Sequence, residues 1–191
     1  FHLTWGTGPE VVRIFEEPVL AGESAGLVSF SFRHRVDELV VEEGSVVGVR
    51  GSVLEMSTAE RGVASSREVI DTFELRAPAV IVTSGGIGGN HDLVRETWPT
   101  ERMGAVPEHL ISGVPAHVDG RMLAISEAAG ARLANRDRMW HYTEGIHNWD
   151  PIWPAHAIRI IPGPSSLWLD AHGRRFPAPN FPGCDNLGTM R

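Results

Sequence analysis

The sequence predicts an α/β fold, and three features predict it. Residues 36–53 read as two short strands joined by a turn containing Gly44, which is typical of a β-hairpin. Residues 79–82, Ala-Val-Ile-Val, form a short apolar run of the kind that is buried on both faces of a parallel sheet. Residues 119–134 place apolar side chains at helical spacing. We therefore expect a parallel sheet, a hairpin segment and a helix.

Composition narrows the class of protein. The chain has 191 residues, of which 42% are hydrophobic and 21% charged, as in ordinary globular proteins. The net charge is −7 and every basic residue is Arg, so nucleic acid is not an expected partner. No run of about 18 apolar residues predicts a membrane span. The single Cys184 excludes an internal disulfide and a Cys-rich metal site, and we expect a cytoplasmic location.

The remaining elements follow from local patterns. Pro9 suits the first turn of a helix, with Glu10 favourable at its positive end, and the helix should end at residues 22–26. Residues 57–66 read as an exposed loop. The apolar spacing predicts one buried face on the first helix, at Val11, Val12, Ile14 and Phe15. Further strands are predicted at residues 27–32 and 68–76, and one helical turn at residues 92–97.

The predicted helix at residues 119–134 can be capped by Asp119 and is interrupted by Gly130 near its end. After it the composition changes, because Trp and Pro become frequent from Asp137 onward. We therefore place a domain boundary near Asn135. The first domain would cover residues 1–135 and the second residues 136–191.

The turn at residues 83–90, Thr-Ser-Gly-Gly-Ile-Gly-Gly-Asn, is the most informative motif. It has four glycines within five residues, directly after the predicted buried strand. Glycines let backbone approach a ligand closely, and strand ends of α/β sheets bind ligands. A merely structural tight turn is the alternative. The dinucleotide fingerprint GxGxxG is absent, because Val11 and His91 stand where its third glycine is needed.

Other catalytic or metal motifs are weak. His141 and His147 lie near Glu144, but HYTEGIH is not the zinc motif HExxH, and we expect no metal site. No GxSxG supports a serine hydrolase. Tyr142 is the only Tyr and lies beside His141, so it could donate or accept a proton. Packing against Trp140 or Trp153 is the alternative for Tyr142.

Taken in order, these segments resemble flavoprotein dehydrogenases of the fumarate reductase and 3-ketosteroid Δ1-dehydrogenase family. That family has a hairpin, then a buried strand with a T-G-G-type turn, then a D-G-led helix with A-G near its end, and then a cap domain. The matching segments are HRVDELVVEEGSVVGVRG, AVIVTSGGIGGN, HVDGRMLAISEAAGA and LWLDAHGRRF. The resemblance covers nearly the whole chain. It implies a partial FAD-binding domain followed by the beginning of a cap, or substrate, domain.

The resemblance also implies site residues. Val36 would offer its backbone to the adenine of FAD, and the turn would lie against the cofactor. The helix start at Asp119 and Gly120 would face the flavin, where its positive end suits electron-rich groups. The turn residues in question are Thr83, Ser84, Gly85 and Gly86.

The chain departs from the family pattern in two ways. The N-terminal GxGxxG unit and the C-terminal segment that closes the flavin site are absent, so we expect a piece of a longer chain, here called the parent protein. The piece alone should bind FAD weakly or not at all and be inactive. Positions that carry catalytic residues in fumarate reductases hold Arg159, Pro162 and Gly183, which argues against fumarate reduction. His141 matches loosely the family's substrate-binding His.

The implied reaction is hydride transfer between a substrate carbon and FAD. The substrate would be a small molecule, steroid-like or an enone. A nicotinamide-dependent reductase and a non-catalytic interaction module are the alternatives. A yellow colour and a flavin absorbance band in the parent protein would separate them.

The proton-handling group predicted from the sequence is Tyr142, with His141 as its neighbour. A phenol stays protonated at neutral pH and can polarise a carbonyl. In the parent protein, Tyr142→Phe should lower turnover by about 10²-fold, the scale of lost acid–base catalysis, with flavin content unchanged. Unchanged turnover in a steady-state assay would assign Tyr142 to the core.

Overall fold

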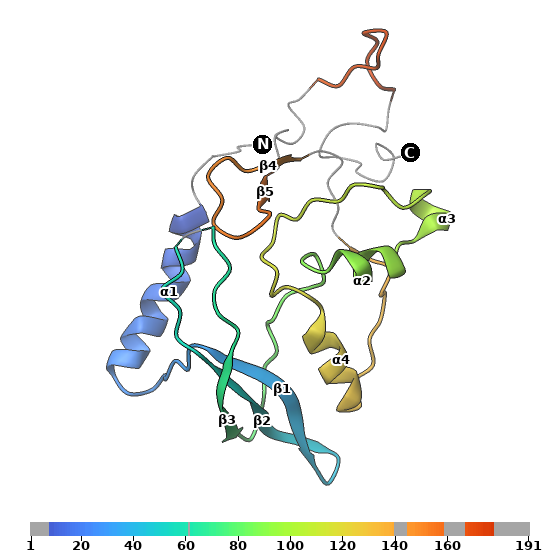
Figure 1. The fold of residues 1–191 in the computed structure, drawn as a ribbon. Helices are drawn as coiled ribbons and strands as arrows, with labels where there is room; N and C mark the ends of the chain where they lie inside the picture. The colour runs from blue at the N-terminus through green and yellow to red at the C-terminus, as the bar shows by residue number, and fades with distance from the viewer. Residues whose placement is uncertain (1–7, 61, 140–144, 159–166, 178–191) are drawn as a thin grey trace. The chain divides into compact units, whose positions relative to one another are not determined.

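The structure is a computed structural model that describes residues 8–60, 62–139, 145–158 and 167–177 (Figure 1). It divides into two compact units, Phe1–His34 and Arg35–Arg191. Each unit is described by itself. The domain boundary predicted near Asn135 stays a prediction.

The first unit contains helix α1, Gly8–Ser24, which confirms the predicted helix. Arg13 forms ion pairs with Glu10 and Glu17, three and four residues away on the helix surface. The predicted burial of one face is wrong for this chain, because Phe15 is 68% exposed. Val11, Val12 and Ile14 are each more than half exposed. The described part of this unit has no second element to cover that face.

The predicted strand at residues 27–32 does not form. Leu27 is 84% exposed, and the rings of Phe30 and Phe32 stack on each other with centroids 5.5 Å apart. Alternation does place the two Phe rings on one side of the chain. A strand also needs a partner for its backbone, and residues 8–34 supply none.

The second unit is organised around a three-stranded sheet in the order β1-β2-β3. Strands β1, His34–Glu42, and β2, Ser45–Leu54, form the predicted hairpin. Its two turn residues, Glu43 and Gly44, both have positive φ angles of 49° and 78°, as a type I′ turn requires. Strand β3, Val69–Arg76, confirms the third predicted strand and pairs antiparallel with β2.

The glycine in the middle of β2 is a steric requirement of the sheet. Gly51 lies opposite Phe73, and a Cβ atom on Gly51 would overlap the carbonyl oxygen of Arg35 and lie 2.9 Å from the Phe73 ring. The same strand carries Arg50, which forms ion pairs with Glu38 on β1 and Glu74 on β3 at 3.0 and 2.8 Å. Close backbone packing and cross-strand charge pairs therefore share this sheet.

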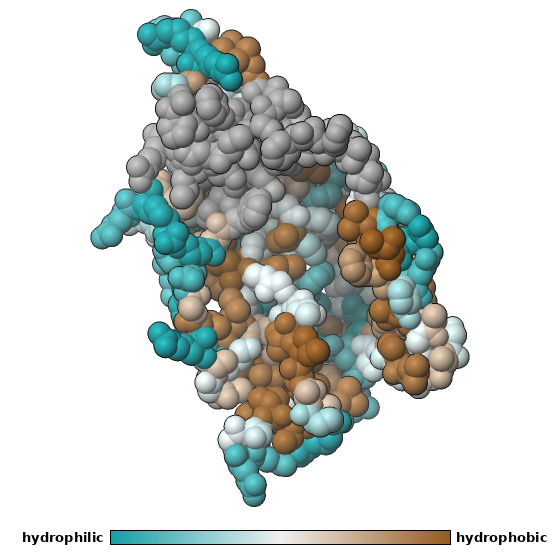
Figure 2. Space-filling view, turned by 180° about the vertical axis from the view of Figure 1, so that it is seen from behind, coloured by the Kyte–Doolittle hydropathy of each residue, from teal (hydrophilic) through white to brown (hydrophobic). Residues whose placement is uncertain are grey.

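The predicted buried strand at residues 79–82 is not a strand, and no parallel sheet is present in the part of the chain that the structure describes. Ile81 is 88% exposed, and the backbone of residues 79–86 makes no hydrogen bond with described residues. Large apolar side chains are also exposed on β3, at Ile70 and Leu75, and apolar patches are visible on the surface in Figure 2. A parallel strand cannot form without a neighbour, and the sequence pattern of residues 79–82 does not contain one.

Two short helices carry the core of the second unit. Helix α2, His91–Glu96, matches the predicted helical turn, and helix α3, Thr100–Met103, follows it. The indole N–H of Trp98 donates to the carbonyl of Gly104 at 3.1 Å. The buried core side chains are Val94, Trp98 and Met103, with Ile87, Val106, Leu110 and Met139 packed against them.

Helix α4, Arg121–Ala128, is shorter than the predicted helix at residues 119–134. Gly130 explains the early end, because its φ of 92° and two backbone hydrogen bonds close a Schellman motif. These bonds run from Gly130 N–H to Glu127 and from Ala131 N–H to Ser126. The place of the helix is predicted correctly, and the side chains of its apolar stripe are half-buried.

Later in the chain, β4, Ile146–His147, and β5, Ala157–Ile158, form a two-stranded antiparallel sheet. His156 is buried in the loop before β5, where its Nδ1 lies 3.0 Å from Asn148 Nδ2. Of the helices described, none is long and apolar enough to cross a membrane.

The steric requirement at Gly51 can be tested. Gly51→Ala should lower the free energy of unfolding of the parent protein by about 1–3 kcal/mol, the usual cost of overpacking. Gly113→Ala is the control, because its Cβ would meet only one atom, at 3.7 Å. Chemical denaturation measures both variants. Equal stability of the two would contradict the requirement.

Candidate functional site

The glycine turn starts with exposed residues and then folds back on itself. The four predicted cofactor residues at its start are exposed. The turn proper is closed by a hydrogen bond of 2.8 Å from Asn90 N–H to the carbonyl of Ile87. Backbone donors and acceptors at the start of the turn are therefore available to a ligand. These four residues are Thr83, Ser84, Gly85 and Gly86.

The two glycines at the start of the turn differ. Gly85 has a φ of 81°, and its Cβ would lie 3.1 Å from Val118, so the fold itself favours glycine there. Gly86 has no positive φ, and its Cβ would meet nothing within 4 Å. The space beside Gly86 is open in the structure, so its lack of a side chain leaves room for a bound group.

The end of the turn packs tightly against residues 114–120. Gly89 N–H donates to the carbonyl of Val118 at 2.8 Å. A Cβ on Gly89 would lie 2.6 Å from the Pro115 carbonyl oxygen, and one on Gly88 would lie 2.9 Å from a Val114 methyl. Gly88 and Gly89 therefore belong to a structural tight turn, which was the alternative interpretation of the sequence. The first part of the turn, residues 83–86, is exposed.

The packing brings the predicted helix start to the turn. Gly120, the N-cap of α4, has a φ of 79°, and its Cβ would lie 2.7 Å from side-chain atoms of Ile87 and Leu93. The predicted cap at Asp119 is wrong by one residue, because the N-cap is Gly120. Asp119 precedes it and accepts a hydrogen bond of 3.0 Å from Arg121 N–H. Asp119 and Gly120 therefore lie beside the glycine turn.

Asn90 joins these two segments with one side chain. Its Oδ1 accepts from Leu93 N–H at 3.1 Å and caps α2, while its Nδ2 donates to the Asp119 carbonyl at 3.2 Å. Asn is a preferred N-cap residue, so the cap could have been predicted from the sequence. The bond to Asp119 could not, because the two residues are far apart in the chain.

The third predicted segment, β1, reaches the same region through Asp37. Val36 is half-buried on β1, and its neighbour Asp37 accepts from Arg121 at 2.6 Å. Asp37 also accepts from Arg35 Nε at 2.8 Å and from Ser52 Oγ at 2.5 Å. The hydrogen bond from Arg35 lowers the pKa of Asp37. The hydrogen bond from Ser52 and the positive charge of Arg121 lower it further.

An open hollow of about 470 Å³ lies on the sheet beside Asp37. Its charged side chains are paired, since Arg50 binds Glu38 and Glu74. The hollow is lined by Asp37, Glu38, Arg50, Gly51, Ser52, Thr72, Phe73 and Glu74.

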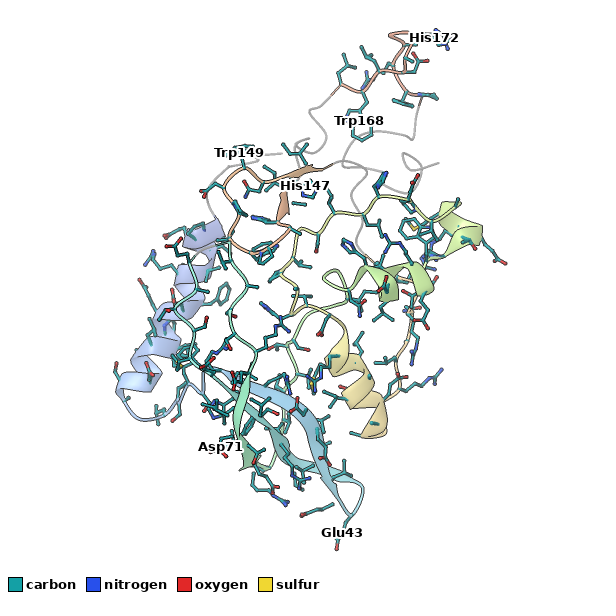
Figure 3. All side chains as sticks on the ribbon, viewed as in Figure 1. Glu43, Asp71, His147, Trp149, Trp168 and His172 are labelled. Carbon is teal, nitrogen blue, oxygen red and sulfur yellow. The ribbon has the colours of Figure 1, made fainter. Side chains whose placement is uncertain are left out.

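The predicted catalytic residues Tyr142 and His141 lie outside the described residues. Figure 3 labels His147 on β4 and Trp149 in the loop after β4. Among the described side chains, no three His, Cys, Asp or Glu residues could together hold a metal ion.

The charge cluster at Asp37 predicts a pH dependence. The folded-state pKa of Asp37 lies below its ordinary value, so its stabilisation is complete above about pH 4 and is lost as the pH falls through the lowered pKa. At pH 7, Asp37→Asn should lower the free energy of unfolding of the parent protein by up to about 1 kcal/mol. Denaturation at pH 7 and pH 3 measures this, and a difference that grows toward pH 3 would contradict it.

Comparison with known proteins identifies the family of the chain. A family model described as "FAD binding domain" matches residues 1–188. A KsdD-like steroid dehydrogenase of Mycolicibacterium smegmatis is 64% identical over 190 residues, and one of Mycobacterium tuberculosis is 62% identical. Each alignment covers 100% of this chain but 34% and 33% of the relative, so the chain spans about a third of their length.

No solved structure matches the chain significantly. The family match covers nearly every residue and includes the glycine turn, the start of α4 and strand β1. The chain therefore belongs to the family of FAD-binding domains.

Proposed function

We propose that the chain is part of a flavin-dependent dehydrogenase and helps to hold FAD through three segments joined in the structure. These segments are β1, the glycine turn and the start of α4. The observation that carries the proposal is the exposed backbone of Gly85 and Gly86, which forms no hydrogen bond with described residues, in a turn that Asn90 connects to Asp119 at its far end. A turn of this kind presents backbone N–H groups to a ligand without a side chain in the way.

Each segment has a part in the proposal. The backbone of Val36 on β1 would contact the adenine. Residues 83–86 would lie along the cofactor, where backbone N–H groups suit its negatively charged and electron-rich parts. The first turn of α4, after Gly120, would point its positive end at the flavin.

Bound FAD would supply the two-electron redox chemistry of the parent protein. The chain's own residues would bind and orient the cofactor. Tyr142, with His141 beside it, is the proposed proton-handling pair. Both lie early in residues 136–191, the proposed beginning of the cap domain.

The proposed substrate is a small molecule of steroid or enone type. The support is the identity of 62–64% with relatives that are named KsdD-like steroid dehydrogenases. We also propose that residues 79–82 join a parallel sheet in the parent protein. The exposed side chains of Ile81 and Val82, and a backbone without hydrogen bonds to described residues, support this, since such a segment is stable only when it is covered.

Gly86→Val tests the cofactor contact. The structure leaves room for a side chain at Gly86, so the variant should fold normally while its isopropyl group occupies the space proposed for FAD. The FAD content of the purified parent protein should fall by about tenfold or more, measured from the flavin absorbance band after denaturation.

Gly8→Val is the matched control, because a Cβ on Gly8 also meets nothing within 4 Å and lies outside the three segments. Full flavin occupancy in both variants would refute the contact at Gly86. An unmodified parent protein that never binds flavin would refute the proposed function as a whole.

A further inference from the structure

We propose that Asp37 and Arg121 are positioning residues, whose ion pair holds the start of α4 in the orientation that FAD binding requires. The inference rests on the proposed function and concerns residues that do not themselves contact the cofactor. Its basis is a single contact between two proposed cofactor segments, the strand that carries Val36 and the helix that begins after Gly120.

The contact joins distant parts of the chain. Arg121 Nη2 lies 2.6 Å from Asp37 Oδ1, although the two residues are 84 positions apart. The side chains of Arg121 and Asp37 are 43% and 26% exposed, so the pair is partly shielded from water. At its other end, Arg121 is held by the hydrogen bond from its backbone N–H to Asp119.

Asp37 is a rigid acceptor. Arg35 donates to both oxygens of its carboxylate, at 2.8 and 3.3 Å, and Ser52 donates to Oδ2. Arg35 Nη2 also donates to Ser52 Oγ at 3.2 Å, which ties the cluster to β2. Arg121 therefore binds a carboxylate whose position the sheet has already determined.

Besides the ion pair, the start of α4 is restrained by the packing of Gly120 against Ile87 and Leu93. Its N-cap is Gly120, which has no side chain to cap the helix. The bond from Asn90 reaches the Asp119 carbonyl, just before the helix, and the Schellman motif acts at the far end. Arg121 is thus the residue of α4 that fixes the first turn to the sheet.

Loss of the ion pair should have two effects on bound FAD. Affinity should fall, because binding would then have to order the start of α4. The midpoint potential should shift to more negative values, because a displaced helix start stabilises the negative charge of reduced flavin less well. A residue that only contributed to stability would not change the potential.

The experiment compares three variants of the flavin-loaded parent protein. Arg121→Gln should raise the dissociation constant for FAD about fivefold and shift the potential negative, measured by fluorescence titration and dye-coupled reduction. Arg121→Lys should keep most of the wild-type affinity for FAD and most of the wild-type potential, because Asp37 receives a single contact from Arg121. Arg76→Gln is the matched control, since Arg76 lies on β3, outside the three segments, and pairs with Glu74 and with Glu42, the last residue of β1.

A double-mutant cycle with Asp37→Asn completes the test. The double variant Asp37→Asn/Arg121→Gln should weaken FAD binding no more than the stronger single variant, because both remove one interaction. Thermal unfolding of each variant shows whether it folds. If Arg121→Gln does not fold, Arg121→Lys is used in its place.

Three results would overturn the inference. If Arg121→Gln has the wild-type dissociation constant for FAD and the wild-type midpoint potential, the inference is wrong and the proposed function is unaffected. Equal losses in Arg121→Gln and Arg76→Gln would indicate general destabilisation instead. Additive effects of Asp37→Asn and Arg121→Gln would show that the two residues act independently. A wild-type parent protein without flavin would refute the proposed function first.

Discussion

The close approach of the glycine turn to residues 114–120 is the constraint on which the rest of the site depends. Gly89 donates to Val118 with its backbone against the Pro115 carbonyl, and Gly120 lies against Ile87. Any Cβ at Gly89 or Gly120 would push the two segments apart. Because this contact holds the end of the turn, its first residues can stay exposed without losing their position. Tight packing at one end of the motif therefore allows an open backbone at the other.

Charge pairs add a second kind of restraint to the sheet. Most of the ion pairs on β1–β3 join strands that backbone hydrogen bonds already hold together, and such exposed pairs contribute little. The pair between Asp37 and Arg121 is different, because it connects the sheet to α4. The contribution of an ion pair to the fold therefore depends on the other contacts between the two elements that it connects.

The apolar patterns of α1 and of residues 79–82 specify surfaces that the described residues do not cover. Phe15 and Ile81 are largely exposed, although their spacing is that of buried faces. An amphipathic helix face or an apolar strand indicates a surface that is buried in the folded protein, but it does not identify the segment that covers this surface. The relatives, about three times as long as this chain, share the same segments.

Local patterns by themselves determined the hairpin at Glu43 and Gly44, the third strand, α1, the α2 turn and the place of α4, since each depends on neighbours in sequence. The family and its cofactor followed from the order of several weak motifs. Only the tertiary structure decided which glycines are structural and which are open. It also joined Asn90 to Asp119 and Asp37 to Arg121, because contacts between distant residues depend on how the chain folds back. Residues 27–32 and 79–82 failed as strands for the same reason: a strand is completed by a partner, and alternation in sequence does not supply one.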